Sequence, residues 1–163
     1  MTDTKRLYYE DVYIKEFSAK VVECRKEEKG FQVILDQSAF YPEGGGQPSD
    51  LGILGDTAVT DVQEKNGELI HYVKSELEPG TEVIGKIDWQ RRFDLMQQHS
   101  GEHIVSGLVH EAYGYNNVGF HMSSDVITID FSGVLDEKQL AEIEEKTNRN
   151  IWEDNPVEIF YPD

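Results

Sequence analysis

The sequence has almost no cysteine and no long apolar run. Cys24 is the only cysteine among 163 residues, so a disulfide within the chain is impossible. No uninterrupted apolar stretch approaches the roughly 18 residues that a membrane-spanning helix requires. The first six residues lack the apolar core of a signal peptide. These absences predict a soluble, cytoplasmic protein without a membrane partner.

Basic residues are also scarce. The chain has 15 lysines and arginines against 32 acidic residues, which gives a net charge of −17. The acidic residues are spread over both halves of the chain rather than gathered in a tail. Such a surface repels phosphate at long range, so the charge taken alone argues against nucleic-acid binding. The hydrophobic content of 38% still suffices for one domain or two small ones.

The hydrophobic pattern changes near residue 88. Before it, short alternating segments are separated by turn signals such as Asn66-Gly67. These segments are residues 19–24, 31–35, 58–63, 68–73 and 83–87. The pattern predicts a small β-barrel or sandwich over residues 1–87.

The second part, residues 88–163, has mixed periodicity. Apolar residues recur every three or four positions from 90 to 113, which predicts a helix capped by Asp88 and ended by Gly114. We then expect a hairpin, a helix and a final strand, which gives an α+β protein of two domains. The expected hairpin covers 118–122 and 126–131, and the final strand covers 156–161. The helix follows Asp136 and runs to about 152. Its expected buried stripe consists of Leu140, Ile143, Thr147 and Ile151.

His99 and His103 lie one helical turn apart in the first expected helix. Positions i and i+4 differ by about 40° and about 6 Å, so both imidazoles can reach one metal ion. Zinc suits such ligands. The alternative is a pair of ordinary histidines on a half-buried face. Ser100 follows His99, so the His-Glu-x-x-His protease motif is absent. His121, on an expected strand, either faces the same cavity or is structural.

A glycine-dense loop covers residues 40–48. Gly44, Gly45 and Gly46 can adopt backbone angles closed to other residues and can present N–H donors to an anion or carboxylate. Gln47 adds a side-chain donor and acceptor. The alternative is a mobile surface loop, although Pro42 and Pro48 would limit its motion. No lysine follows, so a Walker phosphate loop is excluded.

Two stretches together carry a family resemblance. Tyr41-Pro-Glu-Gly-Gly-Gly-Gln-Pro-Ser-Asp50, followed by Arg91-Arg-Phe-Asp-Leu-Met-Gln-Gln-His-Ser-Gly-Glu-His103, closely resembles the alanyl-tRNA editing proteins called AlaX and the editing domain of alanyl-tRNA synthetase. Residues 119–130 also fit. The resemblance implies an N-terminal β-barrel followed by an α/β two-layer editing domain. It also implies a Zn²⁺ site with His99 and His103 as two of the ligands.

The resemblance further implies a Cys-x-x-x-His motif that supplies the other two zinc ligands. No cysteine follows Cys24, so we expect a truncated editing domain whose remaining ligands lie beyond Asp163. The start at Met1, directly before the barrel, favours a free-standing editing protein. We expect this fragment to be weak or inactive, with most tRNA affinity supplied by the part of the protein beyond it.

The implied activity is an aminoacyl-tRNA hydrolase that removes serine or glycine from mischarged tRNA(Ala). Zinc would polarise the ester, orient it or activate a water. The candidate catalytic residues, as contacts for the serine hydroxyl, are Gln47, Ser100 and His121. The candidate substrate-binding residues are Gly44, Gly45, Gly46, Gln47, Arg91 and Arg92, of which the two arginines offer a small basic patch.

Three alternatives remain open. The chain is a non-catalytic module that binds tRNA or a partner protein, or it is the editing portion of a protein related to alanyl-tRNA synthetase. The third alternative, a general zinc hydrolase of small esters, has no visible nucleophile.

Overall fold

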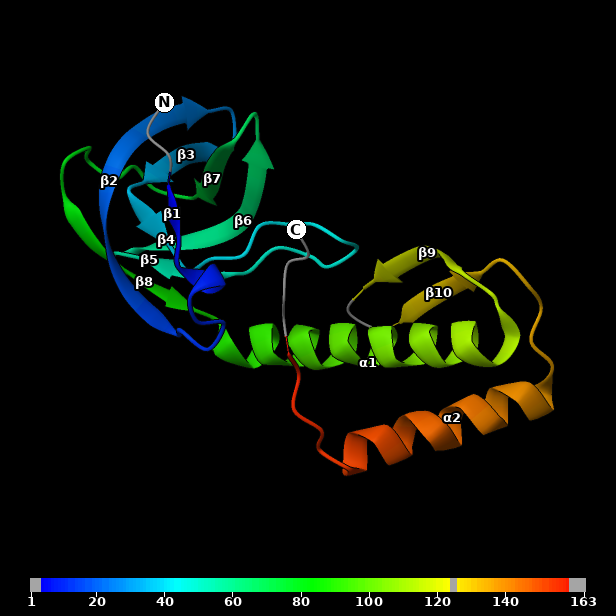
Figure 1. Cartoon of the computed structure of the whole chain (residues 1–163). Coiled ribbons are helices and arrows are strands. Elements are labelled where there is room, and N and C mark those ends of the chain that lie inside the picture. Colours follow the sequence, from blue (N-terminus) through cyan, green and yellow to red (C-terminus); the bar gives the residue numbers. More distant parts are fainter. Residues whose placement is uncertain (1–3, 124–125, 159–163) are drawn as a thin grey trace. The chain divides into compact units, whose positions relative to one another are not determined.

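The computed structural model describes residues 4–123 and 126–158, and it confirms the α+β class (Figure 1). The chain divides into two compact units, Met1–Met96 and Gln97–Asp163. The domain boundary expected between residues 87 and 88 lies at the junction of the last strand of the first unit and a long helix, and it stays a prediction. No helix in the described part of the chain is long and apolar enough to cross a membrane.

Six antiparallel strands form the first unit. They are β2 (Glu16–Glu27), β3 (Gly30–Leu35), β5 (Gly52–Leu54), β6 (Thr57–Lys65), β7 (Glu68–Val73) and β8 (Glu82–Ile87). They pair in the order β2-β3-β7-β6-β5-β8, and β8 pairs back with β2, so the sheet closes into a barrel (Figure 1). Two short strands, β1 (Lys5–Arg6) and β4 (Gln37–Ser38), pair in parallel beside η1 (Leu7–Tyr9).

The barrel interior follows from strand alternation. Along β8 exposed and buried residues alternate strictly, as they do along the first half of β2. The inward side chains form one apolar core, which includes Val21, Val33, Leu35, Phe40 and Leu54. Between β6 and β7, Asn66 and Gly67 both have positive φ, 53° and 82°, which confirms the predicted tight hairpin turn.

The long helix α1 (Trp89–Tyr113) begins and ends as predicted. The Asp88 carboxylate accepts a hydrogen bond from the backbone N–H of Arg91 at 3.2 Å, as an N-cap residue should. At the other end Gly114 has a φ of 69° and donates its N–H to the carbonyl of His110 at 2.8 Å, a conformation in which glycine carries no Cβ penalty.

The second unit contains the rest of α1, the antiparallel hairpin β9 (Asn117–Met122) and β10 (Ile127–Phe131), and helix α2 (Glu137–Trp152). Asp136 and Gln139 form the capping box of α2. In Figure 1 the hairpin and α2 lie on opposite sides of the second half of α1.

Two expectations for the C-terminal part need correction. Of the predicted buried stripe of α2, Ile143 is only 3% exposed, whereas Leu140 and Ile151 are each 52% exposed. Periodicity identifies the apolar side of a helix but not what covers it. Residues 156–158, predicted as the start of a strand, have no regular structure, and residues 159–161 lie outside the described part.

Candidate metal centre

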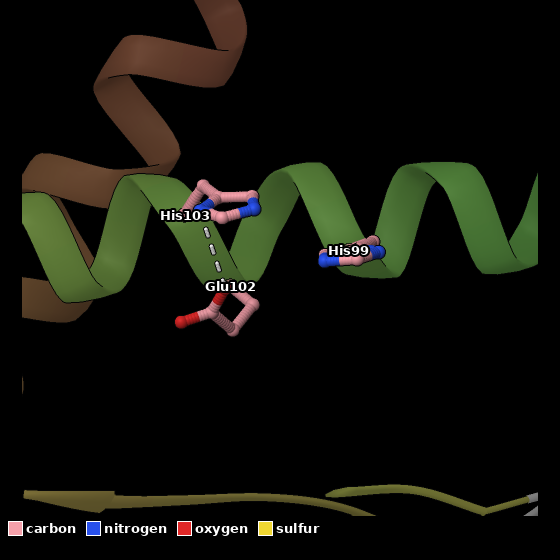
Figure 2. Close-up of side chains that lie close together, drawn as sticks. All are labelled: His99, Glu102 and His103. Carbon is pink, nitrogen blue, oxygen red and sulfur yellow. Dashed lines mark ion pairs between the residues drawn. The ribbon is translucent and has the colours of Figure 1, made fainter. Parts of the chain in front are cut away.

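His99 and His103 project from one side of α1 in the second unit (Figure 2). Their rings are stacked, with centroids 5.0 Å apart and planes 12° apart. The helix therefore brings the two imidazoles together as their spacing predicts. The ring of Phe120 on β9 also packs against His99, with the centroids 5.4 Å apart.

Glu102 is a third possible ligand in this cluster. One donor atom from each of His99, Glu102 and His103 lies within 4.8 Å of the others. Sequence reasoning missed this residue, although the signal was present: a residue three positions after His99 lies on the same side of a helix. The spacing differs from that of the protease motif, in which the glutamate follows the first histidine directly.

The two neighbours Glu102 and His103 differ sharply in exposure. The Glu102 side chain is 4% exposed and that of His103 is 74% exposed, yet Oε2 of Glu102 lies 3.5 Å from Nδ1 of His103. A buried carboxylate is costly unless it is paired and hydrogen-bonded. The cluster thus joins one buried anion to one ring that solvent can reach.

The other carboxylate oxygen of Glu102 has two donors. Ser106 Oγ, from the next turn of α1, and Asn117 Nδ2, from β9, both donate to Glu102 Oε1, the latter at 2.7 Å. The Asn117 Oδ1 in turn accepts the backbone N–H of Gly119 at 3.0 Å. The hairpin therefore holds the carboxylate in place.

The surroundings of His99 favour a neutral ring. Desolvation by burial is the main cause that lowers its pKa, and the neighbouring His103 lowers it further, against an opposing effect of Glu102. Neutral imidazole is the form that binds a metal. Two imidazoles match the ligand chemistry of zinc, and a carboxylate beside them can bind the ion or support one of its ligands. These residues therefore fit the ion that the sequence resemblance implies.

The structure does not bring His121 to this cluster. His121 is exposed on β9 directly after Phe120, whose ring faces His99. Adjacent residues of a strand point to opposite faces, so His121 points away from the face that packs on His99. Ser100 is exposed on α1, one residue after His99. Gln47 belongs to the barrel unit, and its expected place near the histidines stays a prediction.

The glycine loop is a tight turn. The backbone N–H groups of Gly44 and Gln47 each donate to the other's carbonyl, at 3.1 and 3.0 Å, while Gly45 and Gly46 have φ of 59° and 79°. The positive angles explain the glycines. The backbone N–H of Gly44 closes the turn and is therefore not presented to a ligand; the role of the loop in binding substrate stays a prediction.

Arg92 is not part of an exposed basic patch. The residue is 2% exposed, and its guanidinium is bound to the Asp50 carboxylate and to the carbonyls of Ala39 and Val12, at 2.7 and 3.1 Å. It joins the start of α1 to the base of the glycine loop, where Asp50 also accepts the N–H of Tyr41 at 2.7 Å. The predicted role of Arg92 in binding substrate is therefore wrong; that of Arg91, which is half-buried, stays a prediction.

Comparison with known proteins adds a family. Residues 2–91 match the family model described as tRNA synthetases class II (A). The chain is 38% identical to the alanyl-tRNA editing protein AlaX-L of Pyrococcus horikoshii over 162 residues, which are 95% of this chain and 40% of that protein.

Two further relatives have similar identity. The alanyl-tRNA editing protein Aarsd1 of Bos taurus is 36% identical over 164 residues, 91% of this chain and 37% of that protein. An alanine–tRNA ligase of Pyrobaculum neutrophilum is 37% identical over 163 residues, 94% of this chain and 18% of the ligase. The chain thus spans about two fifths of the length of the editing proteins.

Proposed function

Because this chain belongs to the class II (A) tRNA synthetase family, among its alanyl-tRNA editing proteins, we propose that it hydrolyses the ester between a wrongly attached amino acid and tRNA(Ala). The substrates are Ser-tRNA(Ala) and Gly-tRNA(Ala), and the reaction takes place in the cytoplasm. The observation that carries the proposal is the cluster of His99, Glu102 and His103 on α1. It lies in the second unit, which we assign as part of the two-layer editing domain.

In this proposal His99 and His103 would hold a zinc ion, which would supply Lewis-acid chemistry for ester hydrolysis at neutral pH. The depressed pKa of His99 keeps its ring neutral and ready to ligate. The exposed ring of His103 leaves the centre open to an incoming acyl ester, while the buried Glu102 offsets positive charge nearby.

Selection for serine over alanine requires a polar contact to the serine hydroxyl. A site built for that hydroxyl disfavours alanine, because a buried polar group would lose its partner. Gln47 and Ser100 remain the candidates, because His121 points away from the face that packs on His99. The acidic surface repels the phosphates of the tRNA. In this proposal only the aminoacylated end of the tRNA has to approach the cluster.

A deacylation assay tests the proposal. We expect the zinc-supplemented protein to release serine from Ser-tRNA(Ala) weakly but measurably, and faster than alanine from Ala-tRNA(Ala). We expect His99→Ala to abolish that release while the fold is retained. His110→Ala is the matched control, since His110 is an exposed histidine on the same helix. Equal rates with His99→Ala would disprove the metal-centred mechanism. No release at all by the unaltered protein would favour a non-catalytic tRNA-binding module.

A further inference from the structure

We propose that Glu102 is a positioning residue that keeps the proton of His103 on Nδ1, so that Nε2 is the nitrogen offered to the metal. The inference rests on the metal centre of the proposed function and adds a role for the buried network around Glu102. It also extends the centre from α1 to the β9–β10 hairpin, which supplies Asn117.

Glu102 is a buried carboxylate that two donors hold in place. Its side chain is buried, and its Oε1 accepts from both Ser106 Oγ and Asn117 Nδ2. With Oε1 occupied by these two donors, Oε2 lies 3.5 Å from His103 Nδ1. An oxygen acceptor at that position favours a proton on Nδ1. In a neutral imidazole the lone pair available to a metal is then on Nε2.

Glu102 and the second ring nitrogen of His103 point in different directions. In Figure 2 Glu102 projects toward the strands of the hairpin, whereas the second ring nitrogen of His103 lies on the side toward His99. The two imidazoles are stacked, 12° from parallel, so the rings stay side by side. The carboxylate therefore supports the ring from behind. A carboxylate hydrogen-bonded to the rear nitrogen of a metal-binding histidine is a common means of fixing the tautomer and raising ligand basicity.

The hairpin fixes the orientation of Glu102 through Asn117. The backbone N–H of Gly119 donates to Asn117 Oδ1 at 3.0 Å, which sets the orientation of the amide. Its Nδ2 must then point to α1, where it donates to Glu102 Oε1 at 2.7 Å and to Ser106 Oγ at 3.3 Å. With Oε1 held by two donors, Oε2 is the oxygen directed at His103. The order of the network is Gly119, Asn117, Glu102, His103.

The tautomer of His103 can be read by ¹⁵N NMR of the metal-free protein at about pH 8.5, where an ordinary imidazole is neutral. We expect the Nδ1–H form in the unaltered protein. In Glu102→Gln the amide oxygen accepts from Ser106 and Asn117, and the amide N–H faces His103, so we expect the Nε2–H form. Glu111→Gln removes the same charge from an exposed site on α1 and should change nothing.

Metal binding gives a second readout. We expect Glu102→Gln to weaken Zn²⁺ binding about 10- to 100-fold, the usual effect of losing such a support. The visible spectrum of bound Co²⁺ should keep the intensity of an unchanged coordination number. A spectrum that shows the loss of one ligand would make Glu102 a ligand and overturn the inference.

Other outcomes also decide the question. An Nε2–H tautomer in the unaltered protein, or no change in Glu102→Gln, would overturn the inference. Should Glu102→Gln fail to fold, Asn117→Ala keeps the carboxylate and releases its orientation, and it should raise the Nε2–H fraction; an unchanged fraction would count against the inference. The tautomer is measured without metal or tRNA, so it stands apart from the deacylation result.

Discussion

His71 is the one fully buried histidine of the barrel among the described residues, and both of its nitrogens are engaged. Nδ1 lies 3.1 Å from the carbonyl oxygen of Val33, which can only accept, so the proton is on Nδ1. Nε2 then accepts from the Ser38 hydroxyl at 2.7 Å, and Ser38 Oγ accepts the N–H of Phe40 at 3.1 Å. Burial lowers the pKa of His71 to about 4, against an opposing effect of the hydrogen bond to Val33, so the ring is neutral at neutral pH.

The pKa of His71 predicts an acid-sensitive barrel. An unfolded histidine titrates near 6.5, so between about pH 4 and about pH 6.5 the unfolded chain binds a proton that the folded chain does not. The free energy of unfolding should therefore rise with pH across this window and fall on acidification, by at most about 3 kcal/mol. Urea unfolding at several pH values measures it.

His71→Gln should flatten this part of the pH dependence, because glutamine does not titrate. His110→Gln, at an exposed position on α1, is the control and should keep the full slope. Parallel curves for His71→Gln and the unaltered protein would show that the histidine does not account for the acid sensitivity.

At the scale of elements, the ends of the helices and the hairpin turn could be predicted from short sequence signals. The caps at Asp88, Gly114 and Asp136 and the Asn66-Gly67 turn are each set by neighbouring residues, and each was predicted. The strands β1, β4 and β5 are only two or three residues long, too short to show a period. Sequence patterns also do not predict contacts between elements that are distant in the sequence.

Arg92 illustrates that limit. The sequence predicts that Arg92 and Arg91 form a small basic patch. The pattern does not reveal the buried partner Asp50, which lies 42 positions away. The network around Glu102 has the same origin: helix spacing places Glu102 near the histidines, but only the folded hairpin brings in Asn117. The sequence does not predict contacts of site residues with side chains from other elements.

The buried pair of Arg92 and Asp50 predicts a large loss on truncation. Arg92→Ala leaves the Asp50 carboxylate buried without its counter-charge, so the free energy of unfolding of the barrel unit should fall by about 3–5 kcal/mol. Arg92→Lys keeps the charge but not the planar group that reaches Asp50 and two carbonyls at once, and it should lose less. Urea denaturation measures both.

A double variant checks the cause. Arg92→Ala with Asp50→Asn removes both charges, so its loss should be smaller than the sum of the two single losses. A loss below about 1 kcal/mol for Arg92→Ala would place this pair with weak surface ion pairs instead.

At the scale of the whole molecule, charge is the dominant property. A net charge of −17 repels a polyanionic substrate at long range, whereas ordinary nucleic-acid-binding proteins attract theirs. Among the described residues the buried charged side chains are only Asp50, Arg92 and Glu102, so the repulsion comes from the surface. Salt should therefore act on this protein in the opposite sense to its action on a basic tRNA-binding protein.

This repulsion predicts that kcat/KM for Ser-tRNA(Ala) rises severalfold with salt at low ionic strength. Between about 0.01 M and about 0.15 M the screening length falls from about 30 Å to about 8 Å, which removes the long-range barrier to encounter. Initial rates at subsaturating tRNA measure the effect, with a short aminoacylated minihelix as a less charged comparison. A steady decline with salt would instead reveal a cationic contact surface.

The exposed ring of His103 also bears on which cation would occupy the proposed centre. A ligand that is 74% exposed would allow an ion to enter and leave without opening the fold. Divalent ions of the first transition row then compete according to intrinsic affinity, in which copper exceeds zinc. Occupancy in the cell would consequently follow the supply of each free ion, and metal homeostasis rather than a closed cage would determine the identity of the metal.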